Sequence, residues 1–80
     1  MSQIEKLLQK CVRTPQNIRY SDIEKILMHL GFERIEAKGS HIKWKHRKLH
    51  SDIIIPVHNN ECKPFYKKQV SIQIRNLIKK

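Results

Sequence analysis

Cysteines, acidic side chains and long apolar runs are scarce in this sequence, and each scarcity excludes a class of protein. The two cysteines, Cys11 and Cys62, have no Cys-x-x-Cys spacing, so we expect reduced thiols. His58 and Cys62 could offer two zinc ligands, but a closed structural site needs four, and we expect no metal or other cofactor.

The longest apolar run, residues 53–57, is far short of the roughly 20 residues that span a membrane. The N-terminus leads into an amphipathic pattern and resembles no secretory signal, which predicts a cytoplasmic protein without membrane contact.

Positive charge is abundant and unevenly placed. The 80 residues carry 17 Lys and Arg against 7 Asp and Glu, a formal net charge of +10. Residues 1–36 hold 6 basic and 5 acidic side chains, whereas residues 37–80 hold 11 and 2. The basic residues could form a solvated face that only keeps a small protein soluble, but the excess of positive charge is too one-sided for this interpretation. Because the densest cations fall in strand-like sequence, we expect nucleic acid as the partner rather than a membrane surface.

A chain of this length forms a single domain. Helical spacing of apolar residues recurs in three of its segments. Residues 1–16 form a helical extension, with Ser2 as a possible cap, and residues 17–80 form the core. Ser21 and Glu24 form a capping box for a helix over residues 21–30, and Gly31 stands at its expected C′ position. A last helix runs from about Tyr66. It carries an apolar stripe and, on its remaining surface, Lys67, Lys68, Arg75, Lys79 and Lys80.

From Phe32 the apolar period changes to two, which predicts an antiparallel meander over residues 32–37, 41–46 and 52–57. Alternation puts Ile42 and Trp44 on the core face and His41 on the open face. Pro56 indicates an edge strand or a strand end. The sequence therefore predicts an α+β domain: a three-stranded antiparallel sheet with helices on one face, in the order α-β-β-β-α, plus the extra N-terminal helix.

Matching the inward residues predicts a register between the second and third strands. If Ile42 lies opposite Val57, the hairpin loop covers residues 48–51 and His41 falls opposite His58. A slip of two residues would keep every side chain on the same face but would separate the two imidazoles.

A histidine among lysines on an open sheet face could cleave RNA. Its ordinary pKa of about 6.5 allows proton transfer near neutral pH, and nearby cations stabilise charge that develops on a phosphate. In metal-free RNA cleavage the ribose 2′-hydroxyl attacks the adjacent phosphorus, so the protein supplies only a base, an acid and cations. The alternative is that His41 is a polar residue beside a turn. We expect His29, His46 and His50 to be structural.

Several of these residues together carry a resemblance to a known family. Gly31-Phe32 is followed by Lys38-Gly39-Ser40-His41, then a basic strand that ends in His46, then Ile55-Pro56-Val57-His58, and finally the basic helix entrance 63–68. From about Asn17 to the last helix the chain resembles the HicA family of toxin mRNA interferases.

The resemblance implies a double-stranded-RNA-binding-domain-like fold, a metal-independent endoribonuclease acting on mRNA as the toxin of a type II toxin–antitoxin system, and a HicB-type antitoxin that covers the active site. Carried over by position, the catalytic histidine is His41. Many members have a second histidine next, where this chain has Ile42. If that second histidine were the essential one the chain would be inactive, but strand parity favours His41 as the outward residue.

His58 is a weaker candidate for a second proton carrier. The expected RNA-binding residues are Lys38, Ser40, Lys43, Lys45, Arg47 and Lys48.

A non-catalytic RNA-binding module that uses the same cationic sheet is the alternative from another functional class. A DNA-binding regulator lacks a clear helix-turn-helix signal, so DNA would be contacted only indirectly, through an antitoxin complex.

Overall fold

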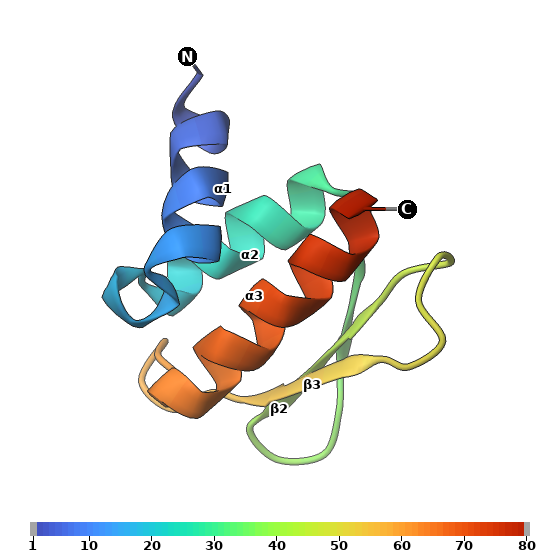
Figure 1. Cartoon of the computed structure of the whole chain (residues 1–80). Helices are drawn as coiled ribbons and strands as arrows, with labels where there is room; N and C mark the ends of the chain where they lie inside the picture. Colours follow the sequence, from blue (N-terminus) through green and yellow to red (C-terminus); the bar gives the residue numbers. More distant parts are fainter. Residues whose placement is uncertain (1, 80) are drawn as a thin grey trace.

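The computed structural model describes residues 2–79, which form one layer of helices on one sheet. The elements in chain order are α1 (Gln3–Arg13), the 3-10 turn η1 (Pro15–Asn17), α2 (Tyr20–His29), β1 (Glu33–Glu36), β2 (His41–Lys45), β3 (Ile53–Pro56) and α3 (Pro64–Lys79). The strands pair in the order β1-β2-β3, antiparallel throughout, and Figure 1 shows the helices gathered on one side of them. The predicted α+β class and element order are confirmed.

Strand alternation separates a buried face of the sheet from an open one. Trp44 and Ile55 are fully buried under the helices, and Ile42 is 9% exposed. His41 and Ile54, which have the opposite parity, are exposed. The predicted assignment of the two faces is therefore confirmed, and β3, which contains Pro56, is an edge strand as expected.

Helix α1 packs on the same core as the rest of the chain. Its first turn is capped as predicted, because the Ser2 hydroxyl accepts a hydrogen bond from the Glu5 N–H at 3.3 Å. At its other end Cys11 is completely buried, and the Val12 carbonyl accepts a hydrogen bond from Arg75 Nη2 of α3 at 2.9 Å. The extension is thus fastened to the last helix of the chain.

Helix α2 begins one residue earlier than predicted, and the predicted capping box is wrong. Ser21 lies inside the helix, and Arg19, the N-cap residue, makes no side-chain cap. The Glu61 carboxylate, 41 residues from Tyr20 in the sequence, instead accepts a hydrogen bond from the Tyr20 N–H at 3.1 Å. A long-range carboxylate replaces the local cap, and it also suits the positive end of the helix dipole.

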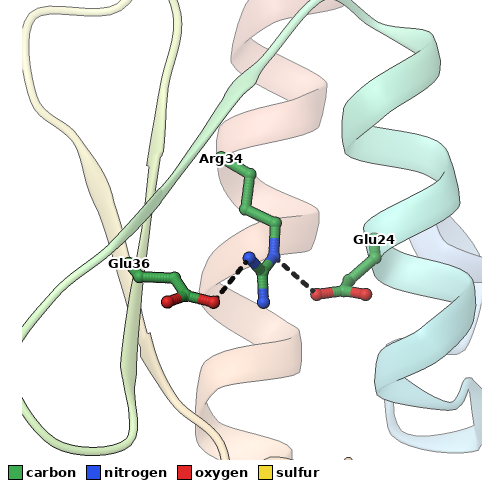
Figure 2. A network of polar contacts seen from close by, with 3 residues as sticks. All are labelled: Glu24, Arg34 and Glu36. Carbon is green, nitrogen blue, oxygen red and sulfur yellow. Dashed lines mark hydrogen bonds and ion pairs between the residues drawn. The ribbon is translucent and has the colours of Figure 1, made fainter.

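Glu24 makes an ion pair in place of the capping box. Its carboxylate lies 3.3 Å from Arg34 Nε, while Glu36 lies 3.2 Å from Arg34 Nη1, so one guanidinium bridges α2 and the edge strand β1 (Figure 2). The hydrogen bonds that Arg34 donates to Glu36 and then to Glu24 raise the pKa of Arg34 above its ordinary value. All three side chains are at least partly exposed, so the network orients the edge strand more than it stabilises the fold.

The end of α2 is the one the sequence predicts. Gly31 has φ +91°, a conformation that costs little only for glycine. The Phe32 N–H donates to the Leu27 carbonyl at 3.0 Å, and the Gly31 N–H donates to the Met28 carbonyl at 3.2 Å. These two bonds form a Schellman motif, which stops the helix and turns the chain into β1.

The predicted register between β2 and β3 is wrong by two residues. Ile42 lies opposite Ile55, and His41 lies opposite Pro56 instead of His58. His46 lies outside the ladder, where its Nε2 is 3.1 Å from the carbonyl of Leu30 just after α2, and the hairpin loop is longer than predicted and covers residues 46–52. Both registers bury the same faces, so the hydrophobic pattern could not distinguish them.

Helix α3 begins at Pro64, two residues before the predicted start, since proline is favoured at a first helical position. Its predicted apolar stripe is confirmed, with Val70 and Ile74 fully buried. Lys67 is not the surface residue that was expected: it is 7% exposed, and its Nζ lies 3.1 Å from the Glu61 carboxylate. Lys80 lies outside the described residues.

Candidate nucleic-acid interface

His41 is the first residue of β2 and follows the tight β1–β2 connection. Gly39 adopts φ +69° in this connection, and the Ala37 N–H donates to the His41 carbonyl at 3.0 Å. The imidazole is exposed, whereas the neighbouring Ile42 is buried. Among residues 2–79 no hydrogen bond holds the His41 ring. The ring can therefore meet a ligand from solvent, which is the condition that a proton-transfer role requires.

His58 lies close to the same connection but is not paired with His41. Its Nε2 is 3.3 Å from the Ser40 hydroxyl, and the Val57 N–H donates to the Ser40 carbonyl at 2.9 Å. The structure thus brings Ser40 and His58 together beside His41. The expected cross-strand pairing of the two imidazoles is wrong, because the register differs by two residues.

The lysines of the open face have acidic neighbours that the linear sequence conceals. Lys43 Nζ lies 4.0 Å from the carboxylate of Asp52, and Lys45 lies directly opposite Glu33 on β1. These carboxylates flank the cations although no acid occurs between Glu36 and Asp52 in the chain. The middle of the sheet is therefore less positive than the sequence suggests.

The remaining predicted RNA-binding residues lie at opposite ends of β2. Lys38 and Ser40 belong to the β1–β2 connection near His41, and Arg47 and Lys48 belong to the β2–β3 loop. The five residues of β2 separate the two ends by about 16 Å. An extended polyanion, rather than a compact anionic ligand, could contact both groups at once.

Each end of the sheet is hollowed. Around the β2–β3 loop a hollow of about 850 Å³ is lined by Lys45, Arg47 and Lys48, together with the acidic Glu33 and Asp52, among others. At the other end a hollow of about 320 Å³ is lined by Ser40 and His41, among others. Three of the predicted cations and the predicted catalytic histidine thus line different hollows of the same sheet.

His46 is structural, as expected. Its Nε2 lies 3.1 Å from the Leu30 carbonyl, which can only accept, so this nitrogen carries the proton. Its Nδ1 accepts a hydrogen bond from the Lys48 N–H at 3.1 Å. The ring also packs on Phe32, with 4.8 Å between centroids. Both ring nitrogens are used to hold the β2–β3 loop against the end of α2.

Sequence reasoning missed the tight turn that the two residues after His58 form. Asn59 and Asn60 have φ values of 53° and 60°, and His58 and Glu61 exchange backbone hydrogen bonds of 2.9 and 3.0 Å around them. This is a two-residue turn of the type I′ family. Two consecutive asparagines, which tolerate positive φ, were the available signal for it.

The thiols are placed for packing rather than reactivity. Cys11 and Cys62 are buried and unbonded, and burial raises the pKa of each to about 11. In residues 2–79 no group of three or more His, Cys, Asp and Glu side chains could hold a metal ion. In that same part of the chain no helix has the length and apolarity that a bilayer crossing needs.

The chain matches a known family over most of its length. A family model described as the HicA toxin of bacterial toxin–antitoxin systems matches residues 20–76, which run from the start of α2 into the last turns of α3. No curated protein and no solved structure matches the chain. The matched segment includes the β1–β2 connection, His41 and both hollows, and leaves out α1.

Proposed function

We propose, from the premise that the chain belongs to the HicA toxin family of bacterial toxin–antitoxin systems, that it is an endoribonuclease that cleaves mRNA without a metal. The nucleophile comes from the RNA, since the ribose 2′-hydroxyl attacks the adjacent phosphorus and expels the 5′-oxygen of the next nucleotide. The products carry a 2′,3′-cyclic phosphate and a 5′-hydroxyl. The protein then needs a proton acceptor, a proton donor and positive charge.

The exposed His41 imidazole carries this proposal. Its ring is open to solvent at the start of a rigid strand and is not engaged by another residue of the described chain. We assign His41 as general base for the 2′-hydroxyl or general acid for the leaving oxygen. His58, held near Ser40, is the candidate for the complementary proton transfer.

The cations around the sheet have the complementary role of binding phosphates. Lys38 lies in the connection before His41, and Lys43 and Lys45 have the same strand parity as His41. Arg47 and Lys48 extend the positive surface to the other end of β2. In this proposal they position the RNA, and those closest to His41 neutralise charge on the scissile phosphate.

Family membership also carries a partner into the proposal. The chain would act on cytoplasmic mRNA and would be inhibited by a HicB-type antitoxin that covers His41. Contact with DNA would come only through that antitoxin complex.

The deciding experiment compares wild type, His41→Ala and the control His29→Ala, which removes an exposed histidine from α2. With EDTA present, wild type and the control should cleave RNA to cyclic-phosphate ends, identified by mass spectrometry. His41→Ala should cleave it about 10²- to 10⁴-fold more slowly while still binding RNA. Cleavage by His41→Ala at the wild-type rate would refute the catalytic assignment. RNA binding without cleavage by wild type would favour the non-catalytic RNA-binding module.

A further inference from the structure

The Asn59–Asn60 turn presents two amide side chains in a backbone conformation that does not require both of them. Each residue has positive φ, and the pattern of a type I′ turn favours glycine at the second position. Both asparagines are exposed. Within residues 2–79 no hydrogen bond engages either side-chain amide. The turn therefore accounts for the positive φ values of the two residues. It does not require their side-chain amides, which stabilise no part of the described chain through a hydrogen bond.

The turn is fixed at both ends, so the backbone that carries the two amides is held at a defined position. On one side the His58 ring contacts the Ser40 hydroxyl at 3.3 Å. On the other side the Glu61 carboxylate accepts hydrogen bonds from the Tyr20 and Cys62 N–H groups, at 3.1 and 2.9 Å, and pairs with Lys67. A backbone anchored in this way loses little conformational entropy when its side chains bind a ligand.

The amides share a hollow with the proposed catalytic histidine. Asn59 and Asn60 line the space of about 320 Å³ that Gly39, Ser40 and His41 also line. A ribose and phosphate that met the His41 ring would bring the attached base into this neighbourhood. The hollow is open on the surface, so an unstacked base could enter it from a single strand.

Asparagine is suited to contact such a base. Its side chain offers one acceptor and two donors in a plane, a pattern that matches the hydrogen-bonding edges of nucleobases. Sequence-specific RNA recognition commonly uses edge contacts of this kind to splayed, single-stranded bases. A side chain that contacts only phosphates binds RNA of any sequence, whereas an amide that contacts base edges can discriminate between bases.

We propose that Asn59 and Asn60 are specificity-determining residues, which read the base next to the phosphate that is cleaved at His41. This inference rests on the proposed function, because it assumes that RNA lies across His41. It adds that the chain selects its cleavage sites through the two amides, while the lysines supply binding that does not depend on sequence.

Glycine substitutions separate the two roles of the turn. Asn59→Gly, Asn60→Gly and the double variant keep positive φ accessible, so urea unfolding should show a free energy of unfolding no lower than that of wild type. Asn76→Ala, which removes an exposed amide from α3, is the control. Each of these four variants is combined with His41→Ala, and the affinity of the combined variant is measured for labelled hexaribonucleotides that differ at one base. Cleavage-site maps on mixed-sequence RNA are recorded for the same substitutions without His41→Ala.

The expected result is a loss of discrimination rather than of binding. The spread of dissociation constants among the four bases should narrow about tenfold in the double glycine variant and stay unchanged in Asn76→Ala. An unaltered spread in the double variant, or no spread in the His41→Ala parent, would overturn the inference. Absence of cleavage by wild type would refute the nuclease proposal, and the binding series would still decide the role of the amides.

Discussion

At the scale of single residues, Glu61 joins three parts of the fold through one carboxylate. It accepts the first N–H of α2 from Tyr20 and the Cys62 N–H, and it neutralises Lys67, whose side chain is only 9% exposed. Burial alone would raise the pKa of Glu61. The hydrogen bonds from Cys62, Lys67 and Tyr20 outweigh burial and lower the pKa below its usual value. The ionised form is therefore the one that the fold stabilises.

Replacement of this carboxylate by an amide should destabilise the fold in a pH-dependent way. We expect Glu61→Gln to lower the free energy of unfolding by about 1 kcal/mol at pH 7, a modest figure because the carboxylate is partly exposed. Since the folded pKa is depressed, the contribution is complete above the ordinary value of about 4.5 and is lost as pH falls through the lower folded value. Urea titrations at pH 7 and pH 3 measure it.

Glu36→Gln is the matched control for this test. Glu36 also pairs with a cation, but its side chain is 78% exposed, so its loss should change stability little. A difference between wild type and Glu61→Gln that is equally large at both pH values would contradict the assigned linkage.

At the scale of elements, α1 is an addition outside the family match that is nonetheless built into the core. Cys11 is completely buried, and the carbonyl at the next residue, Val12, accepts hydrogen bonds from Arg75 at 2.9 Å and from Ser71 at 3.4 Å. These contacts close the C-terminal end of α1 onto α3. Detachment of α1 would expose the Cys11 thiol, so the reactivity of this thiol reports on the attachment.

Removal of the Arg75 contact should loosen α1 without unfolding the protein. In a Cys62→Ser background, Arg75→Ala should raise the rate at which a thiol reagent labels Cys11 about fivefold, which corresponds to the loss of about 1 kcal/mol of hydrogen bonding. The high thiol pKa of about 11 keeps labelling of the closed state slow. Lys79→Ala, an exposed cation on the same helix, is the control. Equal labelling rates in the two variants would show that α1 is held by its apolar contacts alone.

The sequence predicts the elements better than it predicts how they are joined. Apolar spacing locates the helices and strands, and Gly31 correctly ends α2, because both signals are local. The predicted start of α2 was wrong because the carboxylate that caps this helix comes from Glu61, far along the chain. The strand register was wrong because a shift of two residues buries the same face.

At the scale of the whole molecule, folding redistributes the charge that the sequence displays. The second half of the chain has 11 basic and 2 acidic side chains, yet Asp52 and Glu33 come to lie beside the lysines of β2. The exposure of His41 could be predicted from strand alternation. The Lys43–Asp52 pair and the anchored Asn59–Asn60 turn could not, because each depends on the register or on long-range contacts.

This redistribution predicts which cations carry the salt dependence of RNA binding. Arg47 and Lys48 lie in the β2–β3 loop, and no residue in the described part of the chain forms a salt bridge with them, whereas Lys43 already has Asp52 at 4.0 Å. In the His41→Ala background, Arg47→Ala combined with Lys48→Ala should reduce the slope of log affinity against log salt concentration by about 1.4.

Lys43→Ala should reduce this slope by clearly less than half as much. Asp52 already neutralises part of the charge of Lys43, so contact of Lys43 with RNA releases fewer counterions than contact of Arg47 or Lys48. Lys25→Ala, on α2 away from the sheet, should leave it unchanged. Fluorescence titrations of a labelled single-stranded RNA from 50 to 300 mM salt, about the usual range for such slopes, give the values. A slope that falls as far with Lys43→Ala as with the double substitution would mean that RNA displaces Asp52 and follows the middle of the sheet.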